Sequence, residues 1–374
     1  MQPGLAIKLP YSYPYGNRQV VVHNLGGALV PEQQLPHLTV LIPAFNEESC
    51  IADTIRSLQT QTHPPGEILV VDDCSSDRTG EVAQACGARV IRPDHNTGAK
   101  AGAQNYGLAF VHSRYVLSMD ADTTLAPDAI EKILPALEEE GVAAVCGFVL
   151  PRRVSSVWER GRYVEYLLGF SFCKRVQSHF GQPMVASGCF SVYDVATLRA
   201  CGGWPERTRA EDMDLTWTLY EAGHAIRFVP EAVSYPIEPH DFKLLKRQLR
   251  RWSHGFIQNV LVHRESMRNV MLLRWMVAVA LWDGLVASAL YLLVLPLLAV
   301  LLGEPRVLLG YVLDTPALLV PVLFEAAARR KMLFALVCLP AFFVMRAVNA
   351  VFLAEAVWNE VVARRPLLVF EKGH

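Results

Sequence analysis

The stretch Tyr115-Val-Leu-Ser-Met-Asp-Ala-Asp122 is an apolar run that ends on two carboxylates one residue apart. A short run of this kind predicts a buried strand. Successive side chains of a strand point to opposite faces, so we expect Asp120 and Asp122 on the same side at its carboxyl end. Two carboxylates held together offer hard oxygen ligands, which suit Mg2+ or Mn2+ carrying a diphosphate. The pattern alone is weak, because two acids in a solvated loop have the same sequence.

Similar segments precede this strand. Short apolar runs at 38–43, 67–73 and 88–91 predict strands, and helix-forming segments follow them at 44–58, 74–85 and 98–111. Strict alternation of strand and helix predicts an α/β fold with a parallel sheet and helices on both faces. Ligands of such sheets bind at the carboxyl ends of the strands, where Phe45, Asp73, Lys100 and Asp120 would converge.

The following part is less regular. We predict a helix over 127–140, a strand over 142–150 and a long helix over 155–180, whose aromatic residues are best explained as core. The apolar segment 184–193 is interrupted by Gly188, and glycine in a strand is best tolerated where a ligand or another backbone comes close. Glu211 and Asp212 open a helix that runs to Ala222. Acids in a first turn also oppose the helix dipole, so a purely structural role remains open for them.

Composition separates this chain from ordinary soluble enzymes. Of its 374 residues 52% are hydrophobic, so part of the chain is expected to meet lipid. The net charge of -1 gives no footprint for nucleic acid. The eight cysteines form no CxxC pair and are expected to be reduced, as in a chain that faces the cytoplasm. Residues 1–36 form an N-terminal extension in which we predict neither a signal peptide nor a membrane span.

The C-terminal part is predicted to lie in a membrane. Residues 241–270 form a basic amphipathic segment with aromatic residues, typical of a membrane-surface helix, with a purely soluble role as the open alternative. Apolar runs at 275–302, 307–326 and 332–357 give two to three transmembrane helices in a membrane domain at 271–374. Asp283 is costly in lipid and is expected to face protein or water, with a bend near the membrane interface as the alternative. We therefore expect a multi-pass protein of the cell (inner) membrane, with residues 37–240 as a cytoplasmic catalytic domain.

Six motifs now stand in order along the chain. They are Pro43-Ala-Phe-Asn-Glu47, Val71-Asp-Asp-Cys-Ser-Ser-Asp-Arg-Thr79, Lys100-Ala-Gly-Ala-Gln-Asn105, Asp120-Ala-Asp122, Glu211-Asp212 and Gln248-Leu-Arg-Arg-Trp252. Together they resemble the motif set of the family 2 inverting glycosyltransferases. The last one, QxxRW, is similar to that of the processive branch, which makes cellulose, chitin, hyaluronan and poly-N-acetylglucosamine. The resemblance covers residues 38 to about 256.

The resemblance implies a GT-A, Rossmann-like domain that binds a nucleotide diphosphate sugar. It assigns the donor to Ala44, Phe45, Glu47, Asp73, Lys100 and Asp120, the metal to Asp122, the catalytic base to Asp212, and the acceptor to Gln248, Arg251, Trp252 and, more loosely, Cys189. A lysine near the diphosphate would offset charge on the leaving group. A carboxylate base would take the proton of the acceptor hydroxyl as it attacks the anomeric carbon. Each assignment has a plainer rival, such as a helix cap at Asp72 or Asp73 or a solvated Lys100.

The leading hypothesis is a membrane-bound, metal-dependent glycosyltransferase that extends a beta-linked polysaccharide, with a UDP-sugar as the favoured donor. A single transfer to a lipid acceptor, such as polyprenyl phosphate or diacylglycerol, is the alternative, and a non-catalytic binder with the same fold is a third hypothesis. Two or three helices are few for a polysaccharide pore, so secretion would need a homo-oligomer or a partner protein. The sequence leaves the sugar and its linkage open.

Overall fold

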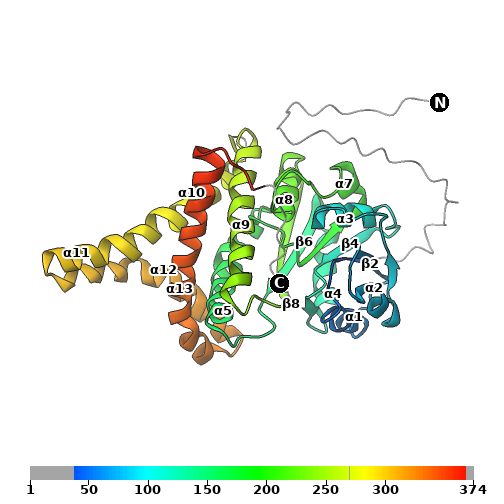
Figure 1. The fold of residues 1–374 in the computed structure, drawn as a ribbon, viewed down its shortest axis with the longest axis horizontal. Coiled ribbons are helices and arrows are strands. Elements are labelled where there is room, and N and C mark those ends of the chain that lie inside the picture. The colour runs from blue at the N-terminus through cyan, green and yellow to red at the C-terminus, as the bar shows by residue number, and fades with distance from the viewer. Residues whose placement is uncertain (1–37, 269, 368–374) are drawn as a thin grey trace. The chain divides into compact units, whose positions relative to one another are not determined.

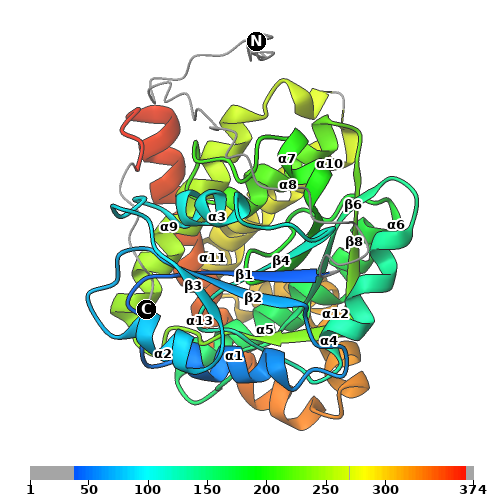
Figure 2. The same ribbon diagram turned by 90° about the vertical axis from the view of Figure 1, so that its right-hand side faces the viewer.

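The computed structural model describes residues 38–268 and 270–367, and the predicted N-terminal extension lies outside them. A mixed sheet with strand order β3-β2-β1-β4-β7-β6-β8-β5 forms the centre (Figures 1 and 2). The strands are β1 (Leu38–Ala44), β2 (Glu67–Asp72), β3 (Arg89–Ile91), β4 (Tyr115–Met119), β5 (Thr124–Leu125), β6 (Val142–Val149), β7 (Phe190–Asp194) and β8 (Ala225–Tyr235). Of the predicted stretch 115–122, residues 115–119 form the central strand β4 and are all buried, whereas Asp120 and Asp122 lie just beyond the end of the strand.

Helices cover both faces of the sheet, as the alternation predicted. Along β1, Val40 and Ile42 point to one hydrophobic cluster, whereas Leu41 points to the other. The first face is covered by α1 (Ile51–Gln59), α2 (Thr79–Ala85) and α4 (Ala129–Ile133), and the second by α3 (Lys100–Leu108), α5 (Val157–Leu168) and α8 (Glu211–Glu221). The sequences of these strands are continuously apolar because the strands are buried on both faces of the sheet.

The prediction of a parallel sheet is wrong at two strands. Strands β1 to β4 pair in parallel, but β7 runs antiparallel to both β4 and β6, and β5 runs antiparallel to β8. A short apolar run cannot distinguish the two directions in sequence, because burial on both faces gives the same composition. The reversal matters for the site: Phe190, which begins β7, pairs with Met119, which ends β4. The segment before β7 therefore reaches the edge where β4 ends.

The predicted long helix over 155–180 is also wrong. It is divided into α5, a π-helical turn at Gly169–Cys173 and α6 (Lys174–His179), and Ser171 has the non-helical ψ of -108°. The predicted helix at 127–140 likewise consists of α4 and a 3-10 turn at Leu134–Glu138. Pro135 stands in that turn, and proline provides no backbone N–H for a continuing α-helix.

Helix α9 (Phe242–Val262) leads into the C-terminal helices. Among the described residues, Met271–Leu302 and Met332–Val362 are long and apolar enough to cross a membrane, which is weak evidence by itself. They include α10 (Met271–Leu281), α11 (Leu295–Leu302) and α13 (Met332–Val357). The middle predicted span forms a 3-10 turn, Pro305–Gly310, and α12 (Tyr311–Ala328), of which Leu318–Ala328 is a shorter apolar stretch. In Figure 1, α11 and α12 project away from the sheet.

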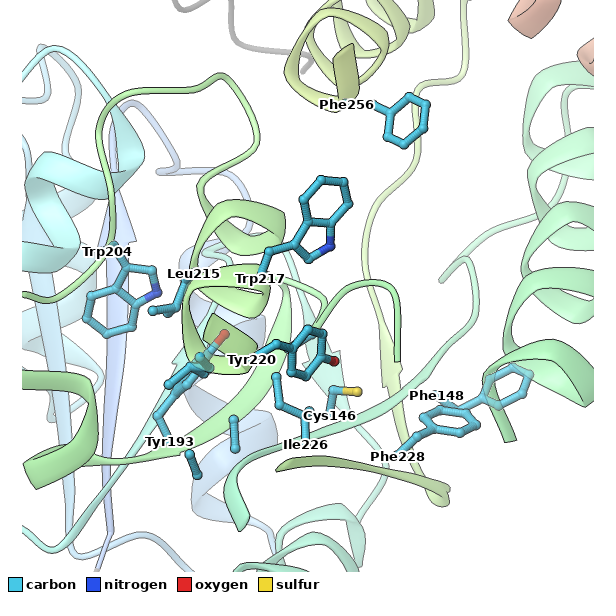
Figure 3. Close-up of a cluster of buried hydrophobic side chains, with 14 of the residues drawn as sticks. Cys146, Phe148, Tyr193, Trp204, Leu215, Trp217, Tyr220, Ile226, Phe228 and Phe256 are labelled. Carbon is cyan, nitrogen blue, oxygen red and sulfur yellow. The ribbon is translucent and has the colours of Figure 1, made fainter. Parts of the chain in front are cut away.

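One hydrophobic core joins the sheet to these helices. Trp217 and Tyr220 of α8 lie in the same cluster as Phe256 of α9, Met276 of α10 and Phe342 of α13. Figure 3 shows its centre around α8, with Trp204 and Tyr193 beside Leu215 and with Tyr220 above Ile226 and Cys146. Helices α5 and α13 approach so closely that a Cβ on Gly161 would lie 2.8 Å from the carbonyl oxygen of Ala341. The domain boundaries at 240 and 270 remain predictions, and the core crosses both.

Candidate functional site

A single cavity of about 1110 Å3 brings the predicted site residues together. Its wall includes all of the residues to which the sequence assigned a role: Ala44, Phe45, Glu47, Asp73, Lys100, Asp120, Asp122, Cys189, Asp212, Gln248, Arg251 and Trp252. The assigned roles remain predictions, but the residues share one space. The sheet and α9 bring together residues that lie up to about two hundred positions apart in the sequence.

The sheet explains why these residues meet. Ala44, Asp73 and Asp120 stand at or just after the carboxyl ends of β1, β2 and β4, which run in parallel beside one another. Because β7 runs the other way, the residues before it, Gly188 and Cys189, arrive at the same edge. Parallel strand ends make a crevice for ligands, and the antiparallel strand closes one side of it.

The loops after β1 and β2 are fastened to each other. Asn46 adopts a left-handed φ of 56°, and its side chain accepts from the backbone N–H of Ser76 at 2.8 Å. The backbone N–H of Glu47 donates to Thr79 Oγ1 at 2.7 Å. A left-handed non-glycine residue is costly unless its surroundings hold it, and such strain concentrates at functional sites.

Asp72 and Asp73 have different surroundings. Asp72 accepts from the backbone N–H of Ser75 at 2.9 Å and from Arg92 at 2.8 Å, so it stabilises the turn and does not line the cavity. Asp73 lines the cavity, and Thr97 donates to both of its oxygens, from N–H at 2.8 Å and from Oγ1 at 2.9 Å. Helix α2 begins after Arg78 and has no side-chain cap, so the helix-cap alternative is wrong for both acids. Asp73 is instead held beside the cavity by Thr97.

Lys100, the first residue of α3, is the cation at the centre of an acidic group. Its Nζ lies 2.5 Å from Asp120 Oδ1 and 3.5 Å from Glu211 Oε1, and it donates to the carbonyl of Gly188 at 3.0 Å. Burial would lower the pKa of Lys100, but the carboxylates of Asp120 and Glu211 outweigh burial and raise this pKa above its usual value. Lys100 is therefore a permanent positive charge at this site, and the alternative of a solvated side chain is wrong.

Asp212 lies on the other side of Gly188. Its Oδ2 accepts from the Gly188 N–H at 2.9 Å, and its Oδ1 accepts from the N–H of Met213 at 2.8 Å. A Cβ on residue 188 would lie 2.9 Å from the Lys100 amine and 3.2 Å from Asp212 Oδ2. A side chain here would displace the amine or the carboxylate, which gives the glycine that interrupts the apolar segment a physical cause.

Asp120 and Asp122 differ in exposure as well as in partners. Asp122 is 5% exposed and accepts from Thr123 Oγ1 at 3.2 Å, whereas the side chain of Asp120 is 34% exposed beside Lys100. The described residues contain no group of three or more His, Cys, Asp or Glu residues arranged for a metal ion. A Mg2+ ion that carries a diphosphate is commonly held by one or two carboxylates together with the phosphates, so this pair fits such an ion.

Helix α9 supplies the opposite wall with Gln248, Arg251 and Trp252. The guanidinium of Arg162 stacks on the Trp252 ring at 4.6 Å and donates to Gln248 Oε1 at 2.9 Å. One face of the indole is therefore already covered, which restricts the flat surface predicted for a sugar ring. Burial, then Asp120, raises the pKa of the Cys189 thiol, so this thiol is neutral at ordinary pH.

The cavity continues between the C-terminal helices, and there the sequence missed several polar residues. Asp283 Oδ1 lies 2.7 Å from Arg346, and the side chain of Asn349 donates to Glu165. All four line the cavity, so the expectation that Asp283 faces protein or water is confirmed. Arg346 and Asn349 could have been identified from the sequence, because each is a polar residue within an apolar run. Glu165 gave none, because it stands in a helix that reads as core.

Several known proteins are similar to this chain in sequence. Residues 39–202 match the family described as Glycosyl transferase family 2. A poly-beta-1,6-N-acetyl-D-glucosamine synthase of Staphylococcus epidermidis is 28% identical over 228 residues, which cover 60% of this chain and 55% of the relative. A probable glycosyltransferase of Bacillus subtilis is 29% identical over 246 residues, which cover 60% of this chain and 56% of the relative. The chain thus spans little more than half the length of these curated relatives.

A solved structure is similar over most of the chain. It is a mannosyltransferase from Pyrobaculum calidifontis in complex with GDP-Man and Mn2+, with a TM-score of 0.59 and 18% sequence identity, and the match covers 89% of each chain. At this identity the likeness speaks for the fold alone, and it extends beyond the sheet to the C-terminal helices.

Proposed function

We propose that the protein transfers a sugar from a nucleotide diphosphate sugar to the end of a beta-linked polysaccharide, because residues 39–202 match the glycosyl transferase family 2 and one relative is named as a poly-beta-1,6-N-acetyl-D-glucosamine synthase. The observation that carries the proposal is the arrangement of Lys100, Asp120, Glu211 and Asp212 around Gly188, in a cavity that α9 closes on the other side. This arrangement places the amine of Lys100, which can stabilise a leaving diphosphate, next to the carboxylate of Asp212, which can accept a proton from an attacking hydroxyl.

The donor occupies the strand ends in this proposal. Phe45 and Asp73 hold the nucleoside, since they line the cavity on the fastened loops after β1 and β2. Lys100 stabilises the negative charge that develops on the diphosphate when the bond to the anomeric carbon breaks, and it needs no protonation step because its pKa is raised. We propose a UDP-sugar, with N-acetylglucosamine as the first sugar to test because of the relative's name.

Asp212 acts as the base. A carboxylate has about four acceptor positions, and the two backbone N–H groups of Gly188 and Met213 occupy two of them. The remaining positions accept the proton of the acceptor hydroxyl while its oxygen forms the new bond to the anomeric carbon. Attack from the side opposite the leaving diphosphate inverts the anomeric centre, without a covalent enzyme intermediate.

A divalent cation, Mg2+ or Mn2+, is part of the proposal. Asp122 would hold it with help from Asp120, and the ion would neutralise charge on the two phosphates as a Lewis acid. Asp122 suits this role because it is buried at the cavity wall, where its carboxylate is fixed by Thr123.

The acceptor lies along α9 in this proposal. Gln248 and Trp252 present an amide and an aromatic ring, the groups that bind sugar hydroxyls and ring faces. Burial raises the pKa of Glu211, and the positive charges of Lys100 and Arg251 oppose this rise, so Arg251 lies near the acidic group. We propose that the helices Met271–Leu302 and Met332–Val362 cross the cell membrane, with the glycosyl transferase domain on the cytoplasmic side.

A lipid-linked acceptor is the second candidate, and one observation favours it. The cavity is lined at one end by Ala280, Gly284, Phe342 and Leu353 of the two apolar helices, next to the Arg346 pair. A sugar acceptor on an acyl or prenyl chain would find both a polar head site and an apolar wall there.

The test is a donor screen followed by product sizing. Purified protein in detergent is incubated with labelled UDP-sugars and Mn2+, and the product is separated by length and by extraction into organic solvent. Products of many sugars support elongation, and a solvent-extractable product with one added sugar supports the lipid acceptor. Release of no nucleoside diphosphate from any donor, with or without Mn2+, would contradict both and favour a binding protein.

A further inference from the structure

Helix α8 carries Glu211 and Asp212 toward the cavity, and a group of charged side chains around the buried His263 and Asp214 holds its opposite face. His263, which follows the end of α9, is 1% exposed. Its Nε2 lies 3.0 Å from Asp214 Oδ1, and its Nδ1 lies 2.5 Å from Glu221 Oε1. Asp214 and Glu221 are separated by about two helical turns and so share one face of α8. A single imidazole therefore joins the first turn of this helix to its last.

The geometry defines the charge of this ring. A neutral imidazole has one N–H donor and one lone pair, so it would direct a lone pair at one of the two carboxylates. With both nitrogens at hydrogen-bonding distance from carboxylate oxygens, the imidazolium is the form of the ring that can donate to both. The other charge facing it is Arg207, whose Nη2 lies 2.7 Å from Asp214, and the edge-on ring of Trp217 packs against it. The two positive charges of His263 and Arg207 thus equal the two negative charges of Asp214 and Glu221.

The pKa values agree with this assignment. Burial lowers the pKa of His263, but the hydrogen bonds with Asp214 and Glu221 outweigh it and raise this pKa above its ordinary value of 6.5. The pKa of Asp214 is lowered, because its hydrogen bonds from His263 and Arg207 outweigh the effect of burial. The group is therefore stable as a set of charges near neutral pH.

The same end of α9 also holds the loop before α8. Gln258 Oε1 accepts from the N–H of Arg209 at 2.9 Å, and Asn259 donates to the carbonyl of Ala210 at 3.1 Å. A Cβ on Gly255 would lie 2.7 Å from the nitrogen of Ala210, so the helix and the loop are in close contact. Helix α9 thus lines the cavity through one segment and fixes the loop that leads to Asp212 through another.

We propose that His263 is a positioning residue: through Asp214 and Glu221 it fixes α8 against α9, so that Asp212 keeps its place relative to the acceptor wall at Arg251 and Trp252. This inference rests on the proposed function, since it takes Asp212 as the base. His263 does not touch the cavity, and it acts only through α8. Displacement of a reacting group by about 1 Å can cost on the order of a hundredfold in rate, so a modest loosening of α8 is enough to slow transfer.

The dependence on pH has a definite sign. A histidine with a raised pKa in the folded protein contributes its stabilisation fully below its unfolded pKa of about 6.5, and loses it as pH rises through the folded value. The kcat of the wild-type enzyme should therefore fall on the alkaline side as His263 loses its proton. The KM for the donor should change less than kcat, because all of the proposed donor residues except Lys100, which pairs with Glu211 of α8, stand at the ends of β1, β2 and β4.

The experiment compares His263→Gln, Glu221→Gln and the control His179→Gln, an exposed histidine on α6, in sugar transfer between pH 6 and pH 10. We expect His263→Gln to lower kcat about tenfold or more at neutral pH and to abolish the alkaline fall. Glu221→Gln leaves Asp214 in place but removes one partner, so the alkaline fall should move to lower pH. His179→Gln should behave as wild type. A folded His263→Gln enzyme with wild-type kcat and pH profile would overturn the proposal, and so would an unmoved alkaline fall in Glu221→Gln.

A second measurement needs no catalysis. Hydrogen–deuterium exchange at one pH should be faster over 207–221 in His263→Gln and in Glu221→Gln than in wild type, with 38–73 unchanged. Equal exchange over 207–221 in all proteins would overturn the positioning role. If the wild-type protein transfers no sugar, the proposed function fails, and the exchange result still decides whether His263 holds α8.

Discussion

Replacement of Asp212 by asparagine tests the proposed base most directly. A general base contributes about 10²- to 10⁴-fold to the rate, which is about 2.7–5.4 kcal/mol of transition-state free energy. We therefore expect Asp212→Asn to lower kcat by about a hundredfold or more, with the donor dissociation constant nearly unchanged. The donor is spared because the substitution lies across Gly188 from Lys100.

The substitution should also lower the stability of the folded protein, because it disturbs hydrogen bonds that Asp212 accepts. Asp212 accepts two backbone N–H groups through different oxygens, so an amide in either orientation turns an NH2 toward one of them. Losing one such hydrogen bond costs about 1–3 kcal/mol of stability. The melting temperature of the variant should therefore fall slightly, and the kinetic assay must be run well below it.

The matched control is Glu211→Gln in the same first turn. Burial raises the pKa of Glu211, and its Oε1 lies 3.5 Å from Lys100, so this side chain supports the cation. We expect it to lose less than about tenfold in kcat. Transfer is measured with labelled donor, donor binding by calorimetry and folding by thermal melting. The reasoning is refuted if folded Asp212→Asn transfers sugar within about fivefold of wild type, or if Glu211→Gln is the more severe variant.

Three further variants test the other parts of the site. Asp122→Asn should raise the Mn2+ concentration for half-maximal activity by about tenfold or more, and an unchanged metal titration would contradict its assignment. Gly188→Ala should lower kcat about tenfold with little change in melting temperature, because the added methyl meets the Lys100 amine at 2.9 Å; wild-type kcat would show that the loop adapts. Trp252→Ala should raise KM for the acceptor by up to about tenfold, and Trp252→Phe less, since the phenyl ring still stacks on Arg162; equal effects would argue against an aromatic contact.

Sequence alone predicted the part of the fold that local patterns specify. The strands that end on Ala44, Asp72 and Met119 were visible because continuous apolar runs followed by polar turns are typical of a sheet covered on both faces. The direction of β7 could not be predicted from the sequence, because pairing direction depends on the path of the chain between strands. The break at Ser171 was missed for a related reason: its dihedral angles depend on tertiary packing, which no local propensity reports.

The site shows the same division. The motif residues could be grouped in advance because parallel strands bring their ends together. Glu165 and Arg162 could not, because a polar residue on a helix that looks like core gives no sign that a cavity lies beside it. The contact between Lys100 and Glu211 also escaped prediction, because it depends on the antiparallel strand that carries Gly188 between them.

The close crossing of α5 and α13 at Gly161 has a practical consequence for anyone who wishes to study residues 38–270 in isolation. A truncated protein that stops before Met271 would leave Tyr163 and Leu167 facing water, because part of the layer that covers them comes from the final helices. Such a fragment should aggregate or require detergent, although every motif residue is retained. Solubility of the excised half is therefore a poor measure of whether the intact enzyme is sound.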